Sequence, residues 1–158
     1  MLRRARSRDV AAMHEIMSNP LAMRYWSSLP HATFAETEKW MSSMIGADHA
    51  VSDDFIVTIG GRLIGKLGCW KLPEVGFLID PASWGKGYAS EALAAFIKRR
   101  RTLGSAALIA DVDPRNAASL ALLRRHGFAE TGRAPATWQI GDELCDSVYL
   151  ALCLRRPE

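Results

Sequence analysis

The sequence predicts an α+β fold with a largely antiparallel sheet, a parallel stretch around a central helix, and about four helices in all. Segments that look extended alternate along the chain with segments whose apolar residues recur at helical spacing. The dipeptide Gly60-Gly61 separates two extended segments, as expected for the tight turn of an antiparallel hairpin. Gly85 and Gly87 lie in a short loop after one extended segment and lead directly into the longest helical segment. Strands and helices are therefore mixed in a single sheet-based unit.

The first 45 residues predict one short strand and two helices. Residues 2–5 are expected to form the opening strand, and Ser7 is expected to cap the first helix. Its apolar positions recur at helical spacing: Val10, Met13, Ile16 and Met17. A loop over residues 20–31 follows. Thr33 and Glu36 have the spacing of a capping box, which opens a second helix. Its predicted core face carries Trp40, Met41 and Met44.

The remaining elements complete the predicted sheet. Three strands form an antiparallel meander: 55–59, 62–71 and 74–79, the last ended by Asp80-Pro81. A long helix from Tyr88 to about residue 103 leads to a buried strand over 106–112. A helix from about 117 to 125 stops at Gly127 because glycine accepts the left-handed conformation at a helix end. Strands over 128–131 and 144–152 are expected to close the chain.

Composition predicts one soluble globular domain covering residues 1–158. The length suits one domain, and 49% hydrophobic with 23% charged residues is typical of globular proteins. The N-terminus has no apolar signal segment and no stretch is long enough to span a membrane, so we expect a cytoplasmic protein without membrane contact. Cys69, Cys145 and Cys153 lack metal-ligand spacing, so they are interpreted as small buried hydrophobic residues and no metal is expected.

Charge patterning argues against nucleic acid as a partner. The formal net charge is only +3, and the run Lys98–Arg101 lies at the end of the predicted long helix. Cations there complement the helix dipole and meet solvent, so we interpret the run as a solvated face. With so small a net charge, we expect no long-range attraction of a polycation to the surface.

The segment from Ile79 to Leu93 carries the first chemical signal. A strand stops at Pro81, a short loop holds Gly85 and Gly87, and a helix begins at once. Such a loop lets unpaired N–H groups converge beside the positive end of a helix, and this arrangement favours a pyrophosphate. The loop is no nucleoside-triphosphatase phosphate loop, because neither Lys-Ser nor Lys-Thr follows, and it lacks three-glycine dinucleotide spacing. An ordinary loop before a helix is the competing interpretation.

A second segment changes that balance. Residues 113–128 combine a polar strand exit, a helix start at Asn116, and a Gly127-Phe128 stop. Together the two segments resemble the GCN5-related N-acetyltransferase (GNAT) superfamily, and residues 2–9 and 74–79 look like its opening and cofactor-binding strands. The run from Trp84 to Ala92 is similar to the branch that holds the ribosomal-protein alanine N-acetyltransferases. The resemblance covers the whole chain and implies a single-domain GNAT-like fold and acetyl-coenzyme A (acetyl-CoA) as cosubstrate.

The resemblance also implies residue roles. Main-chain N–H groups of the loop would bind the pyrophosphate: Trp84, Gly85, Lys86, Gly87, Tyr88, Ala89 and Ser90. Leu78 and Ile79 would pair with the pantetheine arm as a strand does, Asn116 would hydrogen-bond the arm, and Ser119 would lie near the thioester sulfur. Trp84 is a departure, since the superfamily often has Arg or Gln there, and we expect its ring to cover the loop.

Acyl transfer to an amine requires a base for the amine and an acid for the departing thiolate. Many family members use a tyrosine seven residues after Asn116, but this chain has Leu123, so Ser119 is the candidate acid; a role inside its helix is the alternative. In the ribosomal branch a carboxylate precedes the last strand, whereas here Trp138 falls near that place. Glu74 and Asp146 are the substitutes, with pairing to an arginine as the alternative for either. Strand alternation places Asp146 on the face of Leu144, Val148 and Leu150, which predicts burial.

The cost of deprotonation narrows the acceptor. A lysine-like amine of pKa about 10.4 costs about 4 to 5 kcal/mol to deprotonate at pH 7, whereas an α-amine near 7.7 to 8.0 costs about 1 kcal/mol. A chain without an obvious strong base therefore favours an α-amine or another weakly basic amine. Arg24, Tyr25 and Trp26 in the loop 20–31 are the candidate acceptor-binding residues, with His31 interpreted as loop packing.

The predicted function is thus transfer of an acetyl group from acetyl-CoA to a primary amine of a protein N-terminus or small molecule, by a monomer or homodimer. One alternative keeps the fold but not the chemistry, as a non-catalytic acyl-CoA-binding module. Another, a basic nucleic-acid-binding domain, is disfavoured because aromatic and basic residues do not alternate on any predicted strand.

Overall fold

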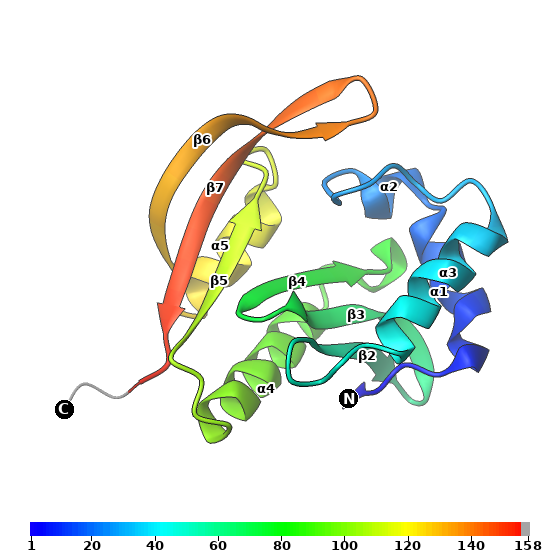
Figure 1. Cartoon of the computed structure of the whole chain (residues 1–158), viewed down its shortest axis with the longest axis horizontal. Coiled ribbons are helices and arrows are strands. Elements are labelled where there is room, and N and C mark those ends of the chain that lie inside the picture. Colours follow the sequence, from blue (N-terminus) through cyan, green and yellow to red (C-terminus); the bar gives the residue numbers. More distant parts are fainter. Residues whose placement is uncertain (156–158) are drawn as a thin grey trace.

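The computed structural model describes residues 1–155, so the last three residues of the predicted 1–158 domain lie outside the described part. In this described part of the chain, seven strands form one sheet in the order β1-β2-β3-β4-β5-β7-β6 (Figure 1). The strands are β1 Leu2–Arg3, β2 Asp53–Ile59, β3 Arg62–Lys71, β4 Glu74–Ile79, β5 Ala107–Val112, β6 Ala129–Ile140 and β7 Glu143–Cys153. Neighbours are antiparallel except β4 and β5, which are parallel. The predicted α+β class and mixed sheet are confirmed.

Within the described residues, five α-helices accompany the sheet: α1 Val10–Met17, α2 Pro20–Met23, α3 Phe34–Ile45, α4 Tyr88–Thr102 and α5 Ala117–Arg125. Four were predicted, and α2 is the addition, inside the loop expected over 20–31. This single turn forms because Asn19 Oδ1 accepts a hydrogen bond from the N–H of Leu21 at 2.9 Å, and because Pro20 stands at the first helical position, where its missing N–H costs nothing.

The start of α1 differs from the prediction. Ser7 lies in a 3₁₀ turn, Ser7–Asp9, and its hydroxyl caps no helix. Asp9 instead accepts a hydrogen bond from the backbone N–H of Arg6 at 2.8 Å and binds the guanidinium of Arg3 at 2.7 Å. At α3 the Thr33 half of the predicted capping box is confirmed, since Thr33 Oγ1 accepts from the N–H of Glu36, whereas Glu36 Oε2 accepts from the N–H of Ala32 and not from that of Thr33.

Two further strand predictions have clear outcomes. The Gly60-Gly61 turn joins β2 to β3 with φ values of +54° and +83°, as a tight hairpin requires. The strand predicted over 128–131 is wrong in length, because β6 continues to Ile140 along β7. Most of β6 is exposed, so its sequence lacks the alternation by which a half-buried strand is recognised.

Apolar side chains fill both faces of the sheet. Ile56 belongs to a cluster with Met13, Met17 and Met41 from α1 and α3. Its neighbours Phe55 and Val57 belong to the cluster under α4 and α5, because successive side chains of a strand point to opposite faces. The sheet therefore separates the helices into two layers, α1 and α3 against one face and α4 and α5 against the other (Figure 1).

The Lys98–Arg101 run is not simply a solvated face. The carboxylate of Asp53 is 1% exposed and binds Arg4 at 2.8 Å, Arg99 at 3.0 Å and Arg100 at 2.9 Å. Burial by itself raises the pKa of Asp53, but the three guanidinium groups outweigh it and hold the pKa below its usual value. Two of the four basic residues thus join α4 to β2.

The cysteine interpretation is correct for one residue of three. Cys69 is buried, and burial raises the pKa of its thiol to about 12. Cys145 is only half-buried and Cys153 is exposed, because both lie on β7 outside the apolar clusters.

Candidate functional site: an anion-binding loop beside an aromatic and acidic cleft

The loop between β4 and α4 folds as a turn that leaves open space in front of it. Asp80 Oδ1 accepts from the N–H of Ala82 at 3.0 Å, which starts a 3₁₀ turn over Pro81–Ser83. Gly85 and Gly87 follow with φ values of +71° and +82°, which only glycine adopts without strain. A Cβ placed on either glycine would have no heavy atom within 4 Å. The loop therefore borders a space large enough for a ligand to approach its backbone.

Six consecutive backbone N–H groups face no protein acceptor there. The first hydrogen bond at the start of α4 runs from the N–H of Glu91 to the carbonyl of Gly87 at 3.0 Å, and no side chain caps the helix. Within residues 1–155, the N–H groups of residues 85–90 donate to no backbone or side-chain oxygen. Unpaired donors at the positive end of a 15-residue helix are suited to bind an anion.

Three side chains of this segment bind the protein instead. The indole N–H of Trp84 donates to the carbonyl of Ile79 at 2.8 Å, and Lys86 Nζ donates to the carbonyl of Ala82 at 2.9 Å. Ser90 Oγ lies 2.7 Å from Nε2 of His126 at the end of α5. The groups of the loop that a ligand can reach are thus backbone N–H groups, and the three side chains stabilise the conformation of the loop.

The edge of β4 faces a gap in the sheet. The parallel pairing of β4 with β5 is confined to Glu74 and Ile109, and towards Ile79 the two strands diverge (Figure 1). The N–H of Asp80 binds the carbonyl of Ile64 in β3, so alternation turns the backbone of Leu78 towards β3. The N–H groups of Phe77 and Ile79 face the gap. The sequence analysis did not propose Phe77, because which residues of β4 turn their N–H groups towards the gap becomes clear only when the pairing of β4 with β3 is known.

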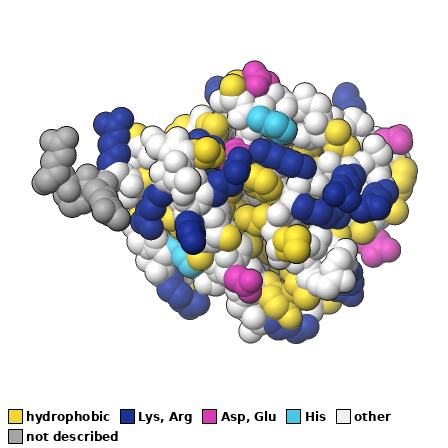
Figure 2. Space-filling view, turned by 90° about the horizontal axis from the view of Figure 1, so that it is seen from below, with side chains coloured by type: hydrophobic (Ala, Val, Ile, Leu, Met, Phe, Trp, Pro, Cys, Tyr) yellow, Lys and Arg dark blue, Asp and Glu magenta, His cyan; other side chains and the backbone are white. Residues whose placement is uncertain are grey.

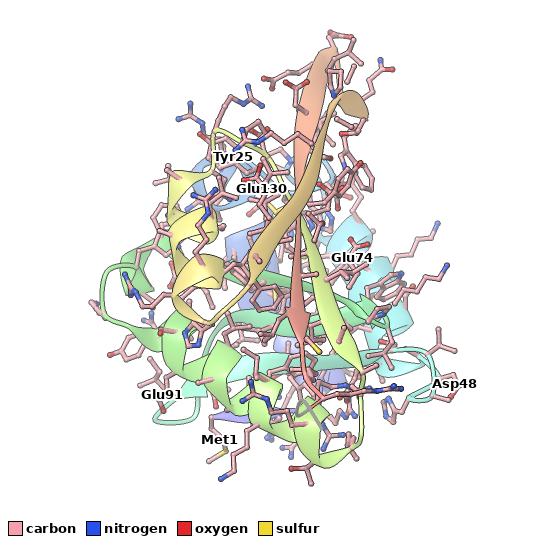
Figure 3. The ribbon with its side chains drawn as sticks, turned by 90° about the vertical axis from the view of Figure 1, so that its left-hand side faces the viewer. Met1, Tyr25, Asp48, Glu74, Glu91 and Glu130 are labelled. Atoms are coloured by element: carbon pink, nitrogen blue, oxygen red, sulfur yellow. The ribbon has the colours of Figure 1, made fainter. Side chains whose placement is uncertain are left out.

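A cleft of about 620 Å³ lies where β4 and β5 separate. It brings together all the residues proposed from the sequence for acid, base and acceptor roles and one of the three proposed for the pantetheine arm, Asn116. The others are Ser119, Glu74, Asp146, Arg24, Tyr25 and Trp26. Leu78, Ile79 and the loop 84–90 lie outside its lining. Figure 3 labels Glu74 at the start of β4 and Tyr25 just after α2.

Asn116 and Ser119 present polar groups at the start of α5. Asn116 Oδ1 accepts from the N–H of Ser119 at 3.1 Å and so caps the helix. Its amide NH₂ and the hydroxyl of Ser119 have no partner among residues 1–155, and both residues line the cleft. Leu123, in the position where the family often has tyrosine, is fully buried in the cleft wall.

The two candidate bases have different surroundings. Glu74 is exposed by surface area, but partial desolvation of its carboxylate, and then repulsion from Asp111, raises its pKa above the usual value, while Lys71 acts in the opposite direction. Asp111 itself accepts a hydrogen bond from the indole N–H of Trp138 at 2.9 Å. The predicted burial of Asp146 is wrong, since Asp146 is exposed where β6 and β7 extend beyond the core. Its Oδ1 accepts from the N–H of Ala136, at an irregularity of β6.

Cations of the chain already cover two aromatic rings of the cleft. Lys66 Nζ lies 5.5 Å from the ring centre of Trp26 and 2.7 Å from the buried carboxylate of Asp54. Arg24 and Arg115 lie 5.3 Å and 5.8 Å from the ring centre of Tyr25. His31 is outside the cleft, where its Nδ1 contacts Thr37 Oγ1 at 2.9 Å, as its interpretation as loop packing expects.

Comparison with known proteins identifies the class. The family model for the acetyltransferase (GNAT) domain matches residues 1–129, which is most of the chain. The chain therefore belongs to the GNAT acetyltransferase family, and the predicted enzyme class is confirmed. It is 26% identical to the uncharacterized N-acetyltransferase YnaD of Bacillus subtilis, over 96% of this chain and 92% of that protein.

Solved structures agree with the fold. A GNAT-family acetyltransferase from Bacillus anthracis superposes with a TM-score of 0.84 at 25% identity, covering 97% of this chain and 93% of that one. The Salmonella typhimurium enzyme that modifies the N-terminal serine of ribosomal protein L7/L12 gives a TM-score of 0.85 at 19% identity, covering 96% and 93%. Salmonella YncA, solved with acetyl-CoA, gives 0.76 at 20% identity, covering 100% and 95%. The resemblance to GNAT enzymes that include the ribosomal-protein branch is confirmed.

Proposed function

We propose that this acetyltransferase uses acetyl-CoA and transfers the acetyl group to an α-amine, of a protein N-terminus or of a small molecule, by direct attack on the thioester. The observation that carries the donor assignment is the run of six unpartnered N–H groups over residues 85–90. Charge-assisted hydrogen bonds of about 1.5 to 3 kcal/mol each suffice to hold a diphosphate there without a dedicated cation. The gap-facing N–H groups of Phe77 and Ile79 and the amide of Asn116 are suited to bind the pantetheine arm.

The reaction moves two protons, one from the attacking amine and one to the leaving thiolate, and we assign one side chain to each. Glu74 takes the proton from the attacking amine, and its raised pKa brings it closer to the pH at which a general base works best. Both residues are exposed, and we favour Glu74 because the carboxylate of Asp146 already binds the N–H of Ala136, whereas the carboxylate of Glu74 accepts no hydrogen bond within residues 1–155. Ser119, whose hydroxyl lacks a partner among residues 1–155, donates to the leaving thiolate. Backbone N–H groups of β4 at the gap stabilise the oxyanion.

Turnover with a panel of amines tests this function. We expect saturable CoA binding, and release of free thiol from acetyl-CoA only when an amine is present. An α-amine should react faster than a matched ε-amine, because its deprotonation at pH 7 costs about 1 kcal/mol and not about 4 to 5 kcal/mol. Binding of CoA without thiol release across the panel would favour the non-catalytic acyl-CoA-binding module.

The proposal covers one catalytic domain over residues 1–158, acting in the cytoplasm as a monomer or homodimer. No helix in residues 1–155 combines the length and the hydrophobicity that a bilayer crossing requires. In the same residues, no group of three or more His, Cys, Asp or Glu side chains is arranged to hold a metal ion.

A further inference from the structure

The cleft concentrates the tryptophans of the chain. Four of the five line it: Trp26, Trp40, Trp70 and Trp138. Trp70 is 51% exposed and Trp138 is 44% exposed, although both sit in a concave surface. Large aromatic surfaces left open in a cleft are typical of ligand sites.

The charge of the cleft is opposite to that of the whole chain. Six carboxylates line it and only three basic side chains do, although the formal net charge of the chain is +3. The face seen in Figure 2, on the side of α4, shows many Lys and Arg side chains and few Asp and Glu. Acidic and basic side chains are therefore concentrated on different parts of the surface, which the net charge does not reveal. The expectation that a polycation is not attracted to the surface does not apply to the cleft.

Several of these cleft charges are already neutralised by contacts within the chain. Lys66 pairs with Asp54 below 5% exposure of either side chain, and Arg115 binds both Asp113 and Glu143. Glu74 and Asp111 have no basic partner within 4.0 Å among residues 1–155, and repulsion from Asp111 acts on Glu74 more strongly than the attraction of Lys71, which also lines the cleft. This pair leaves negative potential in the cleft without a counter-charge in contact.

One of these carboxylates is joined to an open aromatic ring. The hydrogen bond from Trp138 Nε1 to Asp111 Oδ2, 2.9 Å long, holds the indole beside the carboxylate. The rings of Trp26 and Tyr25 are each approached by a cation of the chain, whereas no such contact occurs for Trp70 or Trp138 among residues 1–155. A carboxylate next to a free indole face is an arrangement that binds a cation.

We propose that Asp111 and Trp138, with Trp70, form a binding site for a cationic group on the acceptor, separate from the amine that is acetylated. The acceptor class is then an α-amine compound that carries a second, permanently charged cation, such as a peptide with arginine next to its N-terminus. Glu74 takes the proton from the reacting amine, and Asp111 and Trp138 hold the other charge. The inference rests on the proposed acetyl transfer for the identity of the acceptor.

A pair of dipeptides isolates the second cation. Ala-Arg-amide and Ala-citrulline-amide have the same α-amine and nearly the same shape, but only the first carries a guanidinium. We expect kcat/KM for thiol release to favour the arginine peptide about tenfold, as cation–π and carboxylate contacts of ordinary strength would produce. Their dissociation constants from the CoA-bound protein, followed by tryptophan fluorescence, should differ in the same direction.

Two variants test whether the preference for the arginine peptide arises at Asp111 and Trp138. Asp111→Asn keeps an acceptor for the Trp138 indole and removes the charge, and Trp138→Leu removes the ring from a largely exposed strand. Both should reduce the arginine preference to below about threefold, whereas Glu38→Gln, on the exposed side of α3, should leave it intact. A preference that persists in both cleft variants overturns the site.

The two readouts separate the proposals. Thiol release at equal rates from the two peptides overturns the cation site and leaves acetyl transfer standing. Tighter binding of the arginine peptide without thiol release from any amine overturns acetyl transfer and leaves the cation site standing. Absence of both binding and turnover for either peptide overturns this inference, while CoA titration still decides the donor site.

Discussion

The proposed donor loop, residues 84–90, and the cleft are built in opposite ways. The loop is one continuous segment in which the N–H of Trp84 binds the carbonyl of Pro81 and, within residues 1–155, the N–H groups of 85–90 remain unpaired; its side chains mostly bind the protein itself. The cleft is built from side chains that eight elements and the segment after α2 supply, and its backbone contributes mainly through β4. A site made of backbone needs only a strand end, two glycines and a helix start. A site made of side chains can change its ligand by single substitutions while the fold is kept.

The largest expected effect comes from a substitution that impairs catalysis in the cleft and leaves CoA binding at the loop unchanged. Glu74→Gln should lower kcat about 10³-fold, because a general base contributes about 10² to 10⁴, and should leave the CoA dissociation constant unchanged. In the wild type, activity should fall as the pH drops through the pKa of Glu74, which lies above the usual carboxylate value. That acid limb should be absent from the pH profile of the variant, and a variant that keeps the limb would exclude Glu74 as the base.

The next largest effect comes from a substitution in the loop that weakens CoA binding and leaves the cleft unchanged. Gly87→Val should weaken CoA binding about 100-fold, because the side chain strains a residue at φ +82° and enters the space in front of the N–H groups. Gly104→Val is the matched control at the other end of α4, since Gly104 also has positive φ (+75°) and an open surrounding. Isothermal titration should show weak CoA binding only for Gly87→Val. Equal affinities in the two variants would remove the loop from the donor site.

A third change should affect neither region. Asp53→Asn should lower the free energy of unfolding by about 3 kcal/mol at pH 7, because three arginines lose their buried counter-charge, with kcat and CoA affinity per folded molecule unchanged. The pKa of Asp53 is lowered by folding, so its contribution is present above the unfolded pKa and is lost as the pH falls through the folded one. Urea titrations of the variant and the wild type should therefore converge in acid. Asp142→Asn, an exposed change, is the control.

The smallest effect tests the boundary between the two regions. Trp84→Phe keeps a ring but removes the donor to the Ile79 carbonyl, where β4 passes into the loop. Loss of one such hydrogen bond corresponds to about 1 kcal/mol, so CoA affinity should fall by less than about tenfold. A loss as large as that of Gly87→Val would show that the indole, and not only the backbone, forms the donor site.

The same contrast explains which predictions succeeded. Strands β3 and β4 and helix α5 begin and end at the predicted residues because glycine turns, a proline stop and an asparagine cap act within a few residues. Asp146 was predicted to be buried from strand alternation, but β7 extends beyond the core at that point and leaves it exposed. Alternation reports which residues share a face, and it does not report how far the core reaches along the strand. No local pattern marked Asp111, whose partner Trp138 is 27 residues away.

By itself, the sequence determined the order of the elements apart from α2, the glycine-dependent turns and the helix start at which we propose the anion site. Each of these depends on backbone conformations that neighbouring residues impose. The tertiary structure decided which backbone N–H groups of β4 face the gap and how Asp53 is buried among three arginines. It also brought Glu74, Asp111 and Trp138 together in one cleft. These features depend on how far strands extend, pair and diverge, and the side chains that meet there are far apart in the chain.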